Sequence, residues 1–357
     1  MSSRARAHIR LPALQHNLQR VRELAPGCRV MAAIKADAYG HGALQVAAAL
    51  QQADALAVAT LEEAMQLHWH GETRPLVVLG GVQNLTEMRT AAEHGFEVVL
   101  HDDSHLPLLG QLEAIWKLPL WVKLDTGMHR LGFAPERVAE IQQQLTANAA
   151  VELRGWMTHL ACADDIAQPL TARQLASFDQ ALQGVDGPRS IANSAGILAW
   201  PQSHADWVRP GIMLYGSSPL KNGRAVEHNL RPVMSLRSQL IAVHDVAAGE
   251  GIGYGQTWIC EQDTRVGVVG IGYGDGYPRH LPNGTPLAIR GQRMPLVGRV
   301  SMDMSCVDLT ALPDAVVGDE VELWGDVISV DEIAEAAGTI SYELFCRLTG
   351  RVETLYS

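Results

Sequence analysis

The sequence lacks paired cysteines and long apolar runs, which argues against a secreted disulfide framework and against a membrane-spanning protein. The five cysteines are scattered over 357 residues, odd in number, and none belongs to a C-x-x-C pair. Free, mostly buried thiols are typical of a reducing cytoplasm. No uninterrupted apolar stretch is long enough to cross a bilayer, and residues 1–10 carry arginines without the apolar segment of a secretory signal. We therefore expect a cytoplasmic protein.

The sequence also lacks an excess of positive charge. Lysine and arginine number 28 against 39 acidic residues, which gives a formal net charge of −11. This balance argues against nucleic acid or an anionic membrane as a partner, although a local cationic pocket for a phosphate is compatible with it. His101 and His105 have helical spacing but no evident third ligand, so no metal site is expected. The remaining composition, 47% hydrophobic, is that of a globular protein.

Short apolar runs separated by helical patterns occupy residues 11–218. Eight candidate strands are Val30–Ile34, Ala55–Ala59, Leu76–Leu79, Glu97–Leu100, Leu120–Leu124, Glu152–Thr158, Ser190–Ala192 and Trp207–Arg209. Helical patterns between them include Leu61–Trp69, Leu106–Trp116 and Arg137–Leu145. Strands that are apolar throughout are typical of a parallel sheet buried on both faces. The pattern predicts an α/β protein with a (β/α)8 barrel of the TIM type, and a doubly wound sheet is the alternative.

The pattern changes after Gly216, where strand-like segments are separated by Gly, Pro, Asn and Asp turns. These segments are Leu236–His244, Thr264–Gly270, Pro286–Arg290, Met294–Arg299 and Glu320–Trp324, and only Val330–Ala337 and Tyr342–Leu348 have a helical pattern. We therefore expect a barrel domain over residues 11–218 and a mostly β domain over residues 219–357, joined by residues 220–232. The strand-like Ala7–Leu11 is a candidate to join the C-terminal sheet.

The most informative stretch is Val30–Gly42, in which an apolar run ends on Lys35. A lysine at the carboxyl end of a barrel strand lies where α/β enzymes place their chemistry. Partial desolvation there favours the neutral amine and Schiff-base formation. Tyr39 follows four residues later, and two neighbouring glycines let the backbone approach a ligand closely. A lysine that merely extends its ammonium into solvent from a strand end is the alternative.

This segment resembles the pyridoxal-phosphate lysine motif of the alanine racemases. Six further motifs resemble that family's and follow in its order: Lys123–Gly132, Asn193–Gly196, Arg209–Gly216, Gly253–Gly255, Ile271–Tyr277 and Ser301–Asp303. Seven ordered motifs across essentially the whole chain are more specific than any one of them. The resemblance implies a pyridoxal 5'-phosphate enzyme that interconverts L- and D-alanine, with a barrel followed by a β domain. Such an enzyme serves either D-alanine supply for the cell wall or alanine catabolism, and the sequence favours neither role.

The resemblance implies a two-base mechanism on a pyridoxal-phosphate aldimine, with Lys35 on one face of the substrate and Tyr254 on the other. A free tyrosine titrates near ~10, so Tyr254 needs cationic neighbours, which the resemblance identifies as His159 and Arg209. Arg209 would face the pyridine nitrogen and keep it unprotonated, because arginine has no acceptor and does not release its proton. An unprotonated pyridine nitrogen disfavours transamination and decarboxylation. An aromatic side chain packed in a glycine-rich hairpin is the alternative for Tyr254.

Cofactor phosphate would bind at the loops that follow the seventh and eighth strands. Ser194 opens a short helical run there, and Gly211 and Ile212 follow the eighth strand, a region that commonly binds phosphate in barrels. By the resemblance, the hydroxyls of Tyr39 and Tyr342 also contact the phosphate. A capping box that starts a helix at Ser341 is a further interpretation of the segment around Tyr342.

The resemblance also assigns residues to the substrate. Arg130 bonds the cofactor's phenolate and approaches the substrate carboxylate, the loop of Met302 and Asp303 meets that carboxylate, and Tyr273 lines the entrance. Lys123 matches a lysine that family members often carry as a carbamate, which would brace Arg130, and an unmodified lysine is the alternative.

The resemblance implies a homodimer with shared active sites, in which Lys35 of one subunit meets Tyr254 of the other. A two-fold arrangement closes both sites at once. The alternatives are a racemase of another small amino acid such as serine, a decarboxylase of the same fold, a non-enzymatic pyridoxal-phosphate-binding protein and a Schiff-base aldolase without cofactor. The presence of residues 233–357 argues against the non-enzymatic protein, which would lack a counterpart of Tyr254.

Overall fold

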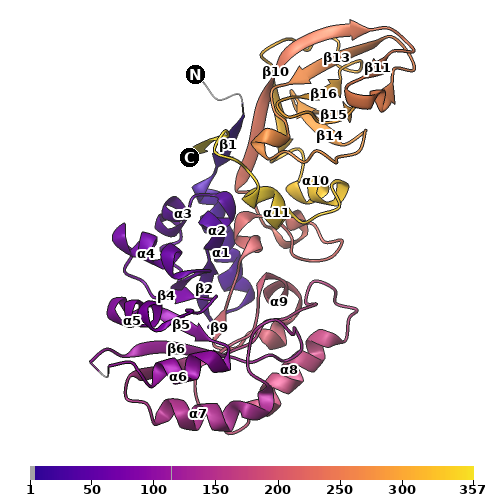
Figure 1. Ribbon diagram of the computed structural model, residues 1–357. Coiled ribbons are helices and arrows are strands. Elements are labelled where there is room, and N and C mark those ends of the chain that lie inside the picture. Colours follow the sequence, from indigo (N-terminus) through magenta and orange to yellow (C-terminus); the bar gives the residue numbers. More distant parts are fainter. Residues whose placement is uncertain (1–4, 114) are drawn as a thin grey trace.

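A computed structural model describes residues 5–113 and 115–357. Figure 1 shows a helix-covered barrel with a mostly β part stacked on it, and the two are joined by irregular chain. Eight parallel strands close the barrel in sequence order. They are β2 (Arg29–Ala33), β3 (Ala55–Val58), β4 (Leu76–Val78), β5 (Glu97–Leu100), β6 (Leu118–Lys123), β7 (Val151–Met157), β8 (Arg189–Ser190) and β9 (Trp207–Val208). The predicted barrel is therefore confirmed, and the doubly wound alternative is wrong.

The barrel is a packed core because side chains from alternate strand positions fill its interior. Met31, Ala57, Val99, Trp121 and Trp207 belong to one buried cluster inside it. Outward-facing strand residues pack instead against the surrounding helices. These are α1 (Leu11–Leu24), α3 (Ala43–Ala49), α4 (Leu61–Trp69), α5 (Leu85–His94), α6 (Leu106–Leu109), α7 (Val138–Thr146), α8 (Leu170–Ala181) and α9 (Ser194–Ala199).

One predicted helix is much shorter than its pattern indicates. The pattern covered Leu106–Trp116, but α6 ends at Leu109. Gly110 follows directly, and glycine is a poor helix former, so the remaining apolar residues continue as turns. Residue 114 lies outside the described residues.

The C-terminal part is a sheet of eight strands that curls back on itself. Its order is β13-β16-β15-β14-β17-β10-β1-β18, and β13 also pairs with β10. The strands are β1 (Arg6–Ile9), β10 (Met234–Val246), β13 (Thr264–Val269), β14 (Pro286–Ile289), β15 (Gln292–Val297), β16 (Ser305–Asp308), β17 (Glu320–Trp324) and β18 (Glu353–Tyr356). β1 runs antiparallel to β10 and parallel to β18, so both ends of the described chain lie in this sheet.

Two helices and a hairpin complete the C-terminal part. The helices are α10 (Val330–Ala336) and α11 (Ser341–Cys346), and the hairpin is β11 (Gly251–Ile252) with β12 (Trp258–Ile259). In Figure 1, α11 lies against the barrel, whereas β11 lies at the far end of the sheet. Within the described residues, no helix is long and apolar enough to cross a membrane.

Candidate active site

Five barrel strands bring chemistry-bearing side chains to the same end of the barrel. Lys35 follows β2, Lys123 ends β6 and His159 lies just after β7. Ser194 follows β8, and Arg209 follows β9 directly. Because all strands are parallel, these carboxyl ends share one rim of the barrel. The fold thus gathers five of the residues that the sequence motifs singled out.

The turn that begins at Lys35 has a left-handed conformation that no sequence pattern predicted. The four residues 36–39 of α2 (Lys35–Gly40) all have left-handed backbone angles, with φ between 51° and 54°. For residues other than glycine this conformation costs ~1–2 kcal/mol each. The buried His41 ring supports the turn, because its Nδ1 lies 2.9 Å from the Tyr39 carbonyl and 3.1 Å from the Ala38 carbonyl. The strained turn fixes the directions of the Lys35 and Tyr39 side chains.

A tyrosine-lined cradle lies beside this turn. The Tyr39 ring is buried, and its centroid lies 5.8 Å from that of Tyr342 on α11. A Cβ at Gly211 would come within 2.6 Å of the Tyr39 hydroxyl, so only glycine fits there without displacing the tyrosine. The Gly211 N–H donates to Ser194 Oγ at 2.8 Å, and the adjoining Ile212 is fully buried. Hydroxyl groups and backbone N–H groups therefore converge from the turn, from both strand-end loops and from α11.

Arg209 is a buried cation held by neutral acceptors. Its guanidinium donates to Ser190 Oγ and to the Thr158 carbonyl, both at 2.6 Å, and to the Ile191 carbonyl at 3.2 Å. His159 Nδ1 lies 3.5 Å away. Burial lowers the pKa of Arg209 to about 10, which still leaves it charged near neutral pH. Its position is rigid because three groups on two neighbouring strand ends fix the planar fork.

Positive charge accumulates at this rim although the protein is acidic overall. Burial lowers the pKa of the Lys35 amine, and Arg130 and Arg209 lower it further. Burial, with Arg209 and Arg130 as the next causes, lowers the pKa of Lys123 to about 8. Burial and the same cations hold the pKa of His159 well below its usual range, so its ring is neutral at pH 7. Among the described residues, no carboxylate lies within ion-pair distance of these lysines and arginines. The rim is therefore a site for an anion.

Four predicted site residues do not join this group within one chain. Tyr254 lies between β11 and β12 and is 68% exposed, in a hairpin that is distant from α2 in Figure 1. Tyr273 and Met302 are also exposed, and their loops contact each other through a 2.8 Å bond from the Gly274 N–H to the Met302 carbonyl. Asp303 pairs with Arg351 at 2.6 Å. The β part thus presents Tyr254, Tyr273 and Met302 outward.

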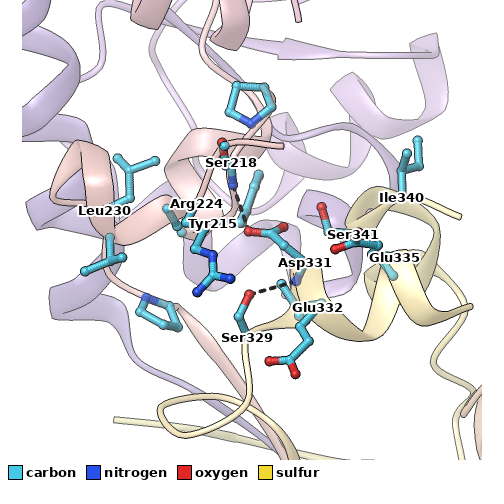
Figure 2. Close-up of a pocket in the computed structure, with 18 of the residues that line it drawn as sticks. Tyr215, Ser218, Arg224, Leu230, Ser329, Asp331, Glu332, Glu335, Ile340 and Ser341 are labelled. Carbon is cyan, nitrogen blue, oxygen red and sulfur yellow. Dashed lines mark hydrogen bonds between the residues drawn. The ribbon is translucent and has the colours of Figure 1, made fainter. Parts of the chain in front are cut away.

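A cleft of about 1160 Å³ separates the chain that leaves the barrel from α10 and α11. Figure 2 shows Asp331 on its wall, pointing toward Ser218 and Ser341. The buried Ser217 hydroxyl donates to Asp331, the Ser218 N–H donates to it at 3.2 Å, and Ser341 Oγ lies within bonding distance of Ser217 Oγ. The predicted capping box at Ser341 is wrong, because its hydroxyl joins this cluster instead of the helix backbone. The cluster ties α11, which carries Tyr342, to the barrel exit.

Comparisons with known proteins decide the family. Residues 9–219 match the model of the alanine racemase N-terminal domain, and residues 233–356 match that of the C-terminal domain. The chain belongs to the alanine racemase family. It is 49% identical over 354 residues to the alanine racemase of Halorhodospira halophila, covering 99% of this chain and 97% of that one. To the Vibrio cholerae enzyme it is 47% identical over 356 residues, covering 99% and 98%.

Solved structures agree. The biosynthetic alanine racemase of Pseudomonas aeruginosa superposes with a TM-score of 0.97 at 44% identity, with full coverage of both chains. The alanine racemase of Bartonella henselae, solved with covalently bound pyridoxal phosphate, gives 0.89 at 30% identity, again with full coverage. The chain is therefore an amino-acid racemase that acts on alanine, and the aldolase and the non-enzymatic protein are not supported.

The residues present fit the family's cofactor, pyridoxal phosphate. Its phosphate suits a rim of cations without partner carboxylates, and the contact between Gly211 and the Tyr39 hydroxyl leaves a cradle that a side chain would fill. The positively charged guanidinium of Arg209 is held at the rim by its hydrogen bonds to Ser190 and Thr158. Lys35 places an amine at the same rim. The fit rests on these contacts of the chain itself.

Two carboxylates of this region were missed by sequence reasoning. Glu63 accepts the Ala36 N–H of the left-handed turn at 2.6 Å, and Asp331 holds the serine cluster at the cleft. The Thr-x-x-Glu pattern of residues 60–63 was a capping signal that could have drawn attention to Glu63. No local pattern marks Asp331, because its partners are more than 100 residues away or on another helix.

Proposed function

We propose that Lys35 and Tyr254 are the two bases of alanine racemisation and that they meet across a homodimer. One observation carries this proposal. Lys35 is set into the barrel rim, whereas Tyr254 is largely exposed on the distant β11–β12 hairpin, so one chain does not bring them together. A second copy related by a two-fold axis can supply Tyr254 to Lys35 and receive the same in return. Each subunit would then complete its partner's site.

Pyridoxal phosphate, when bound, supplies the electron-withdrawing ring that acidifies the α-proton of alanine. We propose that Lys35 holds it as a Schiff base and that Tyr39, Ser194, Ile212 and Tyr342 bind its phosphate together with Gly211. Hydroxyls and N–H groups suit that role, because they donate hydrogen bonds to phosphate oxygens without a change of charge. Arg209 would face the ring nitrogen and keep it unprotonated, in keeping with its fixed, charged guanidinium.

Proton transfer then depends on the protein's own groups. Burial first, and then Arg130, lowers the pKa of the free Lys35 amine, which leaves more of it neutral and able to accept the α-proton. Tyr254, on the opposite face, would return a proton, with the neutral His159 ring and Arg209 as neighbours in the assembled site. Removal on one face and return on the other invert the configuration.

The substrate carboxylate would be held by Arg130 and by the loop of Met302 and Asp303. Arg130 is exposed at the rim, so its fork is available to a carboxylate. Tyr273 would line the entrance, since its loop lies against the Met302 loop. These β-domain groups would come from the same partner chain as Tyr254.

Lys123 would brace Arg130 as a carbamate. A pKa of about 8, lowered mainly by burial, leaves roughly a tenth of the amine neutral at pH 7, and only the neutral amine reacts with CO2. The unmodified lysine is the alternative, and its positive charge would not attract Arg130.

We also propose the division into a barrel domain over residues 11–218 and a β domain over residues 219–357. The C-terminal sheet, which includes β1, supports it. The five cysteines are all unpaired, which supports a cytoplasmic location.

The test mixes two inactive variants, Lys35→Ala and Tyr254→Phe, under conditions of subunit exchange. Each mixed dimer would contain one site with both residues intact and one with neither. Independent sites then give about half of the native activity per mixed dimer, or about a quarter for an equal mixture at statistical exchange. Labelled subunits verify the exchange. Absence of recovered activity despite verified exchange would mean that each chain builds its own site.

A further inference from the structure

Glu63 connects the Lys35 turn to the next barrel strand. Its Oε2 accepts the Ala59 N–H at 2.7 Å, just after β3, and its Oε1 accepts the Ala36 N–H at 2.6 Å, just after Lys35. Glu63 lies in the first turn of α4, where the Thr60 hydroxyl caps the helix by accepting the Glu63 N–H at 3.3 Å. One carboxylate oxygen therefore completes the helix start, and the other holds the first residue of the left-handed turn.

Helix α5 provides a comparison, because it has a glutamate at the same distance from its N-cap but no left-handed turn beside it. In α5, Asn84 caps the helix, and Glu87 occupies the same position that Glu63 occupies in α4. Glu87 Oε2 accepts the Gln83 N–H at 2.7 Å, which repeats the bond to Ala59. Its Oε1, however, accepts from the Asn84 side chain. The two glutamates thus share the helix cap and the charge, and only Glu63 reaches the segment that carries Lys35.

The contact matters because the turn is held by few bonds near Lys35. Ala36 is exposed, so its N–H is protected by the bond to Glu63 and not by burial. The Tyr39 end of the turn has its own support from His41. Without Glu63, the strained backbone beside Lys35 loses its side-chain anchor, whereas the Tyr39 end keeps its contacts.

Glu63 also places negative charge beside the Lys35 amine. It raises the pKa of Lys35, against burial and the two arginines that lower it. The groups that face Lys35 are Glu63 from α4, Cys346 from α11, Lys123 and Arg130 from β6 and its loop, His159 from the end of β7, and Arg209 from β9. A base that must hold the abstracted proton for part of each cycle benefits from such a counter-charge.

We propose that Glu63 is a positioning residue for racemisation, which anchors the left-handed turn at Ala36 and so fixes Lys35 at the barrel rim. The inference rests on the proposed role of Lys35. It predicts that loss of the Glu63 carboxylate loosens the start of the turn and misplaces the base, while loss of the equivalent carboxylate on α5 does neither.

The experiment compares the holoenzymes of Glu63→Gln, Glu63→Asp and the matched control Glu87→Gln. Hydrogen exchange of a peptide covering residues 34–40 should accelerate at least about tenfold in both Glu63 variants and stay at the parental rate in Glu87→Gln. The kcat of Glu63→Gln should fall about 10- to 100-fold with a smaller change in KM, because a base displaced by about 1 Å loses rate more than binding.

The pH profile separates charge from position. In Glu63→Gln the acid limb of kcat should move to lower pH, since the ammonium of Lys35 loses a neighbouring carboxylate while the other facing groups are unchanged. In Glu63→Asp the charge remains and the side chain is shorter, so exchange should accelerate without that movement. If Glu63→Gln does not fold, the exchange rate of Glu63→Asp decides the proposal.

Parental exchange of the 34–40 peptide in both Glu63 variants, or equal acceleration in Glu87→Gln, overturns the role of Glu63. A separate experiment tests the assumption that Lys35 is the lysine that binds the cofactor. Each holoenzyme is reduced with borohydride, which fixes the cofactor to its lysine as a label, and the labelled peptide is then mapped. Label on a lysine other than Lys35 refutes the proposed function, whereas label on Lys35 with unchanged exchange refutes only this inference.

Discussion

Replacing Asp331 by alanine should destabilise the protein far more than replacing it by asparagine. Alanine removes the charged acceptor of the buried Ser217 hydroxyl, which keeps only the Ser341 hydroxyl as a partner, and the acceptor of the half-buried Ser218 N–H. Each of these two hydrogen bonds to a carboxylate contributes ~1–3 kcal/mol, so the expected loss is about 2–6 kcal/mol. Asparagine can still accept from the Ser218 N–H, and its amide can donate to the Ser217 oxygen, so its cost should be below about 2 kcal/mol.

Thermal unfolding of the holoenzyme measures this difference. An unfolding entropy of ~2.1 cal/mol/K per residue over 357 residues makes 1 kcal/mol equivalent to about 1.3 °C. Asp331→Ala should therefore lower the Tm by about 3–8 °C. Glu335→Ala, one turn later on α10 and exposed in the same cleft, is the control and should change it by less than about 1 °C. Equal losses for the alanine and asparagine variants would refute the hydrogen-bond argument.

The pH dependence of the asparagine variant provides a second check. Burial raises the pKa of Asp331, although its hydrogen bonds oppose the shift. The folded protein therefore binds a proton here more readily than the unfolded chain, and the contribution of Asp331 to stability falls as the pH rises through that range. Asparagine does not titrate. The difference in Tm between Asp331→Asn and the parent protein should therefore increase as the pH rises above the ordinary pKa range of aspartate. A difference that decreases with pH would contradict a raised pKa of Asp331.

Three further outcomes follow from the barrel rim. Gly211→Ala should raise the dissociation constant for pyridoxal phosphate about 5- to 100-fold, because its Cβ would displace the Tyr39 hydroxyl; equilibrium dialysis with unchanged affinity would contradict the cradle. Arg209→Glu should lower racemisation and raise side transamination in product analysis, since the ring nitrogen could then hold a proton; unchanged partitioning would remove Arg209 from that role. Acylation of Lys123 in the protein should follow a titration near pH 8 by mass spectrometry, and an ordinary lysine profile near pH 10 would contradict its burial among cations.

Much of this protein could be predicted from local patterns. The apolar runs that end at Lys35, Lys123 and Arg209 are short, bounded by turn residues and apolar throughout, so they identify parallel strands and the rim where those strands end. The ends of the predicted strands agreed with the structure to within about two residues, whereas the strands β11, β12, β16 and β18 were not predicted. The order of the motifs also identified the family, because residue types at fixed spacings carry the chemistry of a site. Helix α6 is a further difference, because it ends before Gly110 although the apolar pattern continues to Trp116.

The rest was decided by contacts between residues distant in sequence. The left-handed turn has no sequence signal, because alanine, aspartate and tyrosine do not favour that conformation by themselves. It persists because Glu63 and His41 bond to it. Ser341 has the pattern of a helix cap, yet its hydroxyl forms a hydrogen bond with Ser217, which is distant in sequence but adjacent in the fold.

The separation of Lys35 from Tyr254 is likewise a property of the tertiary structure. Both lie in recognisable motifs, and nothing in those motifs gives the distance between them. The long strand β10 carries the chain away from the barrel, and the β11–β12 hairpin follows its far end. Local sequence sets short-range conformational energies, whereas the path of the whole chain determines which side chains share a site.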